Sequence, residues 1–277
     1  MGTLYVVGTP IGNLEDITLR ALRTLRQVSL IAAEDTRSTG RLLAHYHIET
    51  PLTSYWEHNK LSKLHTILAA LEEGDVALVS QAGMPGLSDP GYELIRAAIE
   101  ADHRVSPIPG PTAPITALVV SGLPTDRFLY LGFLPRRAGA RRRLLAQVAP
   151  VQHTLLAFEA PHRLLETLKD VEKILGDREM AIARELTKLH EEVWRGRVSQ
   201  ARAHFTAQPP RGEFTLVIAG AGPEEAHWKE ERVRATVEEL LGAGVPRREA
   251  VKAVAEMADW PAQEVYQLAL TEKREND

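Results

Sequence analysis

Short apolar runs alternate with amphipathic helical patterns in the N-terminal part of the chain. The runs typical of buried strands are residues 4–8, 28–35, 51–55, 75–80 and 104–108. Apolar side chains recur at helical spacing over 19–25, 61–71 and 92–103. Because strands that are apolar throughout need cover on both faces, this alternation predicts a mostly parallel sheet with helices on either side.

The pattern resumes after a linker-like segment, SGLPTD at 121–126, and changes again near Gly222. An amphipathic helix is expected over 162–175, and further strand-like runs cover 128–134, 154–160, 180–187 and 213–220. From 229 to 275 three helices and no strand are expected. The sequence therefore predicts two α/β domains with a cleft between them, at 1–122 and 123–224, and a small helical C-terminal appendage at 225–277.

The composition is that of an ordinary globular protein. The chain has 277 residues, of which 44% are hydrophobic and 25% charged, so it can bury a sizeable core. It has no cysteine, which excludes disulfides, thiolate metal sites and a cysteine nucleophile. No basic segment precedes the first apolar run, and no apolar stretch approaches the roughly 20 residues of a membrane span. We expect a cytoplasmic protein.

Glycine- and proline-rich loops follow four of the predicted strands of the first domain. They are residues 8–13 (GTPIGN), 34–37 (EDTR), 80–91 (SQAGMPGLSDPG) and 109–113 (PGPTA). One such loop alone is typical of a structural turn, but open parallel sheets bind ligands beyond the carboxyl ends of their strands. Four loops at that edge therefore indicate a pocket. No GxxxxGK[ST] or GxGxxG phosphate motif and no metal-type histidine spacing is present. We therefore expect no metal.

Two features are compatible with binding a nucleic acid. Although the net charge is −4, five arginines fall within residues 136–143. A local basic patch of this kind suits phosphate contacts, and a solvated helix start is the alternative. The C-terminal helices have the pattern of a helix-turn-helix. For them a nucleic-acid reader and an appendage that packs or dimerises stay equally open.

Several long motifs occur in an order that resembles one known family. They are VVGTPIGNLEDIT, AAEDTR, VSQAGMPGLSDPG, PIPGPTA, GLPTDRFLYLGFLP, FEAPHRL, ARELTKLHEE and RGEFTLVIAG. Together they are similar to the small-subunit ribosomal RNA methyltransferase I family, in the tetrapyrrole-methylase-like class of S-adenosylmethionine enzymes. The match runs from residue 3 to about 222 and extends loosely into the helical region.

This resemblance implies two α/β domains with the cofactor in the cleft between them, usually in a homodimer. The implied activity is methylation of the ribose 2′-oxygen of a cytidine in the decoding region of the assembled small ribosomal subunit. The implied cofactor residues are Ile11, Ala82, Gly83, Met84, Leu87, Thr112, Ala113, Phe158 and Glu159. Backbone groups of the Gly/Pro loops would bind the amino-acid end of the cofactor, and Met84, Leu87 and Phe158 would form an apolar wall for adenine. The chain departs from the family pattern at Gln81, where Asp is usual, and at Met84, where Thr is usual.

Methyl transfer to a ribose hydroxyl calls for a group that accepts its proton. Glu34 and Asp35, beside Arg37 at the ligand edge, are the first candidates, and Lys188 is the second. For the segment 34–37, positioning of RNA or cofactor and a helix cap with a local ion pair are the alternatives. The expected RNA contacts are Arg37, Arg136, Arg137, Arg141, Arg142, Arg143 and Arg163, and an interdomain salt bridge is the alternative for Arg163.

Two other functions stay open. One is a methyltransferase of the same class that acts on a small molecule such as a tetrapyrrole. The other is a non-catalytic RNA-binding assembly factor, which would not bind S-adenosylmethionine. The helical C-terminal region and the arginines outside the cofactor loops favour RNA over a small molecule.

Overall fold

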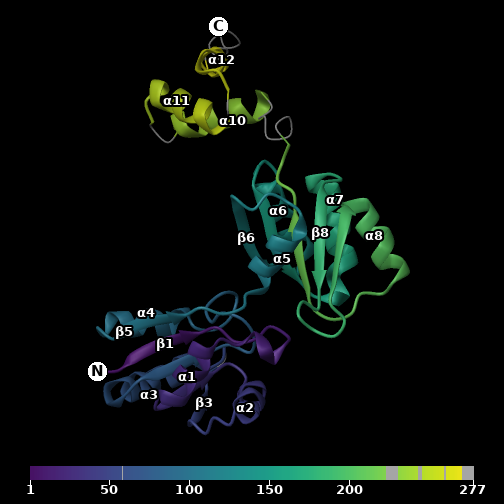
Figure 1. Cartoon of the computed structure of the whole chain (residues 1–277). Helices are drawn as coiled ribbons and strands as arrows, with labels where there is room; N and C mark the ends of the chain where they lie inside the picture. The colour runs from purple at the N-terminus through teal and green to yellow at the C-terminus, as the bar shows by residue number, and fades with distance from the viewer. Residues whose placement is uncertain (58, 223–229, 243–244, 259, 270–277) are drawn as a thin grey trace.

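The structure is a computed structural model, and it describes residues 1–57, 59–222, 230–242, 245–258 and 260–269. Figure 1 shows two sheets with helices around them and a separate group of helices at the C-terminal end. The expected α/β class and the helical C-terminal appendage are confirmed. Within the described part of the chain, no helix combines the length and the apolar character needed to cross a bilayer.

The first sheet is fully parallel, with strand order β3-β2-β4-β1-β5. Its strands are β1 (Thr3–Val7), β2 (Leu30–Ala33), β3 (Leu52–Ser54), β4 (Val76–Val79) and β5 (Arg104–Ile108). Helices α1 (Leu19–Gln27) and α2 (Thr36–His45) cover one face, and α3 (Lys60–Glu73) and α4 (Tyr92–Glu100) cover the other. Ala77 of β4 packs with the first pair and Leu78 with the second, because successive side chains in a strand point to opposite faces. The predicted parallel sheet with two covered faces is confirmed.

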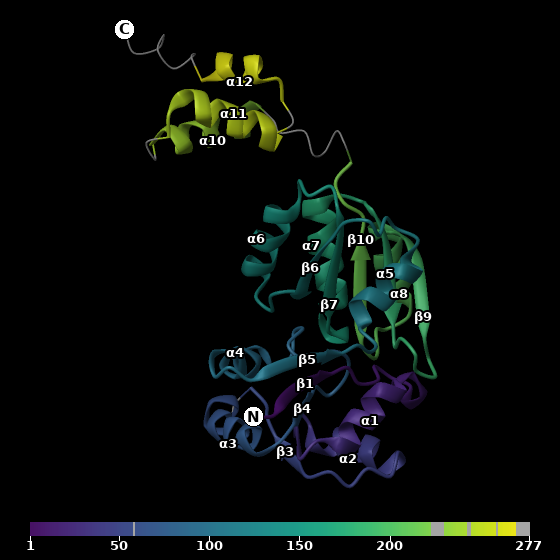
Figure 2. The ribbon, with the colours of Figure 1, turned by 60° about the vertical axis from the view of Figure 1, so that its left-hand side comes forward.

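The second sheet is mixed, with strand order β6-β7-β10-β8-β9. Its strands are β6 (Phe128–Phe133), β7 (Thr154–Glu159), β8 (Glu179–Arg184), β9 (Glu192–Arg197) and β10 (Phe214–Ile218). Strand β6 runs parallel to β7, whereas β10 lies antiparallel between β7 and β8, and β9 antiparallel to β8. Because β10 is antiparallel to β7, its first residues lie beside the last residues of β7, at the edge that faces the first domain (Figure 2).

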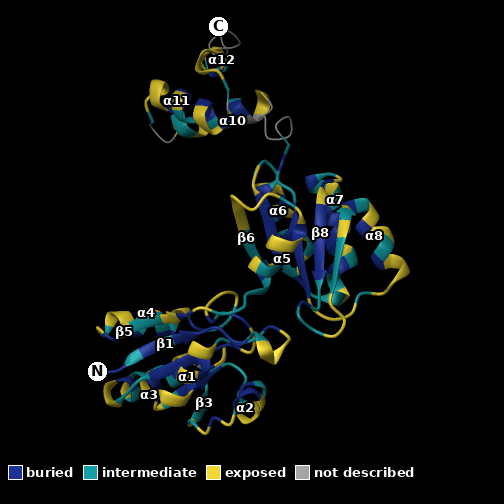
Figure 3. Cartoon of the chain, in the orientation of Figure 1, coloured by how far each residue is buried: buried dark blue, intermediate teal, exposed yellow. Residues whose placement is uncertain are grey.

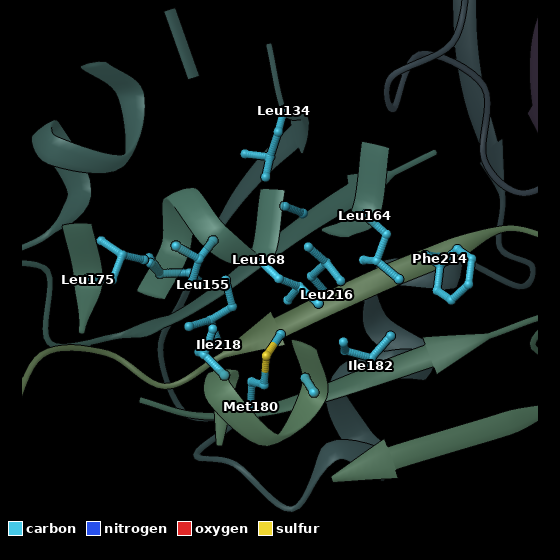
Figure 4. Close-up of a cluster of buried hydrophobic side chains, with 14 of the residues drawn as sticks. Leu134, Leu155, Leu164, Leu168, Leu175, Met180, Ile182, Phe214, Leu216 and Ile218 are labelled. Atoms are coloured by element: carbon cyan, nitrogen blue, oxygen red, sulfur yellow. The ribbon is translucent and has the colours of Figure 1, made fainter. Parts of the chain in front are cut away.

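Helices cover both faces of the second sheet. On one face lie α6 (Ala138–Val148), α7 (Leu164–Leu175) and α8 (Val198–Ala207), and their core is shown in Figure 4. On the other face lies α5 (Ala113–Ser121), which packs on β7, β8, β9 and β10. The predicted first domain, 1–122, includes α5, but this helix packs with the second sheet. The apolar cluster between α5 and the second sheet also contains Ile11, from the loop after β1. Apolar contacts therefore join the two domains.

Among the described residues after the second sheet, three helices have a core of their own. They are α10 (Glu230–Gly242), α11 (Arg247–Ala258) and α12 (Ala262–Leu268). Val233, Val237, Val254 and Val265 form the centre of this core. Both ribbon views place the helices at the end of the second domain that lies away from the first (Figures 1 and 2). Of the region predicted as helical, residues 225–229, 243–244, 259 and 270–277 lie outside the described residues.

Candidate functional site

The loops at the carboxyl edge of the first sheet are held together by close backbone contacts. Thr9 and Gly83 exchange two backbone hydrogen bonds, of 2.9 and 3.0 Å, so the loops after β1 and β4 lie side by side. Gly83 has φ +80°, a conformation that favours glycine. Gly8 and Gly110 touch so closely that a Cβ on Gly110 would lie 2.9 Å from the Cα of Gly8. These glycines let three loops converge on one place.

Replacing Gly110 with Ala is expected to lower the free energy of unfolding by about 1–3 kcal/mol, because the new methyl group forces backbone apart. Gly40 provides the control, since it lies inside α2 with open space around it, and Gly40→Ala should be neutral or slightly stabilising. Urea unfolding of both variants measures this. Equal stability of the two variants would contradict the close-contact role of Gly110.

A pocket with a cavity volume of about 350 Å³ lies between the loops of the first sheet and the edge of the second. This volume is within the range of small-molecule sites. Its lining includes all nine residues predicted for the cofactor: Ile11, Ala82, Gly83, Met84, Leu87, Thr112, Ala113, Phe158 and Glu159. The hydroxyl oxygen of Thr112 is buried and has no hydrogen-bond partner among the described residues, so it is available to a polar group of a ligand. Whether these residues hold a cofactor stays a prediction.

The second domain adds residues to the pocket that the sequence did not single out. Gly212 and Glu213 come from the loop just before β10, Thr215 from the start of β10, and Phe133 from the end of β6. These positions reach the pocket because β10 runs antiparallel to β7, which the apolar pattern of residues 213–220 did not reveal.

Two carboxylates in the pocket act on one another. The Oε2 atom of Glu34 accepts a hydrogen bond of 3.0 Å from the backbone N–H of Gln81. Burial, and to a lesser degree the negative charge of Glu34, raise the pKa of Asp89 to about 7, against an opposing hydrogen bond from Ser80. Glu34 was predicted as a site residue and does line the pocket, whereas Asp89 was missed.

Asp35 caps the start of a helix, and a catalytic role for it stays a prediction. Its Oδ1 atom accepts hydrogen bonds from the backbone N–H groups of Arg37 and Ser38, at 2.8 and 3.2 Å, at the start of α2. These bonds lower the pKa of Asp35, so the side chain is a weak base. The alternative of a helix cap is therefore correct for this residue. Arg37 is exposed on the same turn, and its contact with RNA stays a prediction.

Lys188 is not a suitable proton acceptor either. Its Nζ atom lies 3.0 Å from Glu185 and 3.1 Å from Glu213. Although burial by itself lowers the pKa of Lys188, the hydrogen bonds to these two carboxylates outweigh it and raise the pKa. The raised pKa favours the protonated amine, so a role for Lys188 as a base stays a prediction that this environment does not support. The side chain packs against the first domain instead, since a Cβ on Gly12 would lie 2.5 Å from its Cγ.

Arg163 and Glu159 form a buried pair within the second domain. The carboxylate of Glu159 binds the guanidinium of Arg163 and the hydroxyl of Thr167, and Nη2 of Arg163 also donates to the carbonyl of Leu134 at 2.7 Å. The side chain of Glu159 is fully buried, and that of Arg163 is 13% exposed. The ion pair of Arg163 is therefore not interdomain, and contact of Arg163 with RNA stays a prediction. Glu159 lines the pocket, but its carboxylate is already engaged.

The arginine cluster divides into one buried and four accessible side chains. Arg141 is 3% exposed, and its guanidinium binds Asp170 at 2.6 and 2.8 Å, so it is a core ion pair and not an RNA contact. Arg142 also approaches Asp170, at 3.3 Å, but stays half exposed. The other three, Arg136, Arg137 and Arg143, are exposed around the start of α6. The helix-start interpretation thus describes the position of the cluster, and RNA contact of the exposed arginines stays a prediction. In the described part of the chain, no three His, Asp or Glu side chains gather as a metal site would require.

Comparisons with known proteins agree with this architecture. The profile of the family described as Tetrapyrrole (Corrin/Porphyrin) Methylases matches residues 3–202. A protein of Synechocystis sp. named "Ribosomal RNA small subunit methyltransferase I" is 50% identical, over 98% of each chain. A protein of Thermotoga maritima with the same name is 52% identical over 79% of this chain and 99% of its own. The crystal structure of a cobalt precorrin-4 methyltransferase shares the fold, with a TM-score of 0.61 and 17% identity over 78% of this chain and 94% of that one.

The long motifs in the sequence and these near full-length relatives identify the same group, which confirms the resemblance. The chain belongs to the tetrapyrrole methylase family and, within it, to the ribosomal RNA small subunit methyltransferase I family.

Proposed function

We propose that the chain is an S-adenosylmethionine-dependent methyltransferase that methylates the ribose 2′-oxygen of a cytidine in the decoding region of small-subunit ribosomal RNA. The observation that carries the proposal is the pocket between the two sheets. In a chain of this family, nine residues expected at the cofactor line one cavity, together with a pair of interacting carboxylates. From the resemblance we also propose a homodimer in the cytoplasm, which sedimentation and fractionation would test.

The residues of the pocket fit S-adenosylmethionine in kind. The cofactor, when bound, supplies a methyl group on a sulfonium. The backbone of Ala82 and the hydroxyl of Thr112, which has no partner among the described residues, would bind its polar amino-acid end. Apolar side chains of Ile11 and Phe158 would enclose its adenosine end. The enclosure matters for rate, because a methyl transfer depends on holding donor and acceptor in line.

Asp89 is the group that we assign to the proton of the ribose hydroxyl. A general base works best when its pKa is close to the working pH, and the pKa of Asp89 is about 7. Glu34 supports this role, because its negative charge helps to raise that pKa. We prefer Asp89 to Asp35 and Lys188, because Oδ1 of Asp35 caps a helix and Nζ of Lys188 binds two carboxylates.

Mass mapping of ribosomal RNA from cells with and without this chain tests the proposal. We expect one 2′-O-methylated cytidine of the small subunit to disappear with the chain and to return on complementation. Methyl label that enters a free tetrapyrrole instead would support the small-molecule alternative. No calorimetric binding of S-adenosylmethionine would support the assembly factor.

The exposed arginines next to α6 lead to a second prediction. In a triple variant with Arg136, Arg137 and Arg143 replaced by Ala, RNA affinity should fall and the slope of log K against log salt should weaken by about one unit per lost phosphate contact. The double variant Arg20→Ala/Arg23→Ala, exposed on α1, is the charge control. Filter binding across a salt series measures both slopes. Equal slopes in the triple variant and the control would remove the cluster from the RNA interface.

A further inference from the structure

Strand β6 contains an irregularity that changes the direction of its last side chains. Its pairing with β7 moves from Tyr130↔Leu156 to Phe133↔Phe158, so two residues of β6 stand opposite one residue of β7. Gly132, inside this bulge, has φ +66°. In a regular strand, Tyr130 and Phe133 would point to opposite faces, because they are three residues apart. With the bulge, both rings contact Phe158, with centroid distances of 5.6 and 5.2 Å.

The bulge places the ring of Phe133 at the mouth of the pocket. Phe133 lines the pocket, yet 60% of it is exposed to solvent. Burial of a large apolar side chain is favourable, so an exposed phenylalanine ring is stabilised when a ligand covers it. Bulges beside functional sites commonly re-aim a side chain. The exposure of this ring is therefore a consequence of local backbone geometry.

The surroundings of Phe133 include the groups that the proposed reaction uses. A Cβ on Gly132, the preceding residue, would lie 3.1 Å from the Oγ of Ser88, and Ser88 directly precedes Asp89. The hydroxyls of Ser88 and Tyr130 form a hydrogen bond of 2.8 Å that fixes this approach of the two domains. The exposed Arg136 and Arg137 follow Phe133 within four residues of the chain. The planar apolar surface of Phe133 thus shares the pocket with the carboxylate pair and lies close in sequence to two exposed arginines.

We propose that Phe133 is a stacking platform for the unpaired base of the nucleotide that enters the pocket, and that Arg136 and Arg137 contact the phosphates beside it. This inference rests on the proposed function. Proteins that bind single-stranded RNA hold splayed bases on aromatic faces, and every base has such a face. Phe133 and Leu87 line the mouth of the pocket with 60% and 37% of their surface exposed, so they are more open to solvent than an enclosing wall for adenine would be. The deeper Phe158 suits that second role.

A series of substitutions at Phe133 tests the platform. The variants Phe133→Tyr and Phe133→Trp keep an aromatic face, Phe133→Leu keeps apolar volume only, and Phe133→Ala keeps neither. Phe128→Ala is the matched control, because Phe128 is an exposed phenylalanine of the same strand outside the pocket lining. The substrates are assembled small ribosomal subunits that lack the modification and methyl-labelled S-adenosylmethionine. Each variant is measured for KM of the subunits, Kd of S-adenosylmethionine and thermal unfolding.

We expect Phe133→Ala and Phe133→Leu to raise KM for the subunits by about 5- to 100-fold. The Tyr and Trp variants and Phe128→Ala should stay within about two-fold of the unsubstituted chain, and Kd for S-adenosylmethionine should stay constant throughout. If Leu restores binding as well as Tyr, or if Kd for the cofactor rises with KM, the platform is disproved. If the unsubstituted chain transfers no methyl group to the subunits, the proposed function itself fails. The two failures are therefore distinguishable.

Discussion

Asp89→Asn is expected to lower kcat for methyl transfer by about 10²- to 10⁴-fold, the usual contribution of a general base. The amide has almost the size of the carboxyl group but cannot take the proton of a ribose hydroxyl. Binding of S-adenosylmethionine, measured by calorimetry, should change far less than kcat. An Asn variant with near-normal kcat would show that another group or water accepts the proton.

The pH dependence of kcat gives an independent measure of the same residue. Because only the ionised carboxylate accepts a proton, and because the pKa of Asp89 is raised to about 7, kcat should rise about ten-fold per pH unit below pH 7 and level off above it. In Glu34→Gln, the loss of the neighbouring negative charge should lower the pKa of Asp89 and move the acid limb to lower pH. The glutamine can still accept the hydrogen bond from Gln81. An acid limb that does not move would contradict the coupling of the two carboxylates.

Arg163→Ala is expected to lower the free energy of unfolding by about 3–5 kcal/mol, because it leaves the carboxylate of Glu159 buried without its cation. Chemical denaturation monitored by circular dichroism measures this loss. The double variant Glu159→Gln/Arg163→Met removes both charges and should recover much of the stability. If Arg163→Ala instead keeps its stability and weakens RNA binding with a smaller salt slope, Arg163 would be a phosphate contact after all.

The sequence predicts most of the strands but only part of the helical cover. Strand β9 escaped prediction because its burial alternates weakly at the edge of a sheet. Helix α5 is apolar on all sides, so it has no amphipathic pattern that predicts a helix. Only the loop before it and the linker after it were predicted from the sequence. A helix that is apolar all round can be assigned to one sheet only when the structure of that sheet is known.

Helical spacing within α6 distinguishes the buried arginine of the cluster from the exposed ones. Arg141, Leu145 and Val148 are spaced as i, i+4 and i+7, and all three are buried on one face of α6. Helical periodicity alone could have removed Arg141 from the predicted RNA contacts. Asp89 is a different case, because an acid between Ser and Pro in a glycine-rich loop is typical of a turn. Its perturbed pKa comes from burial and from Glu34, 55 positions earlier in the chain.

The antiparallel course of β10 has a consequence for the order in which the molecule is made. The pocket needs residues 212–215, and these follow all other strands of both sheets in the chain. During synthesis, the first domain can fold alone, since domains generally fold as units from the N-terminal end. A nascent chain that stops short of β10 would therefore carry the glycine loops without a closed binding cavity. The three C-terminal helices emerge only afterwards, when the catalytic body is already complete.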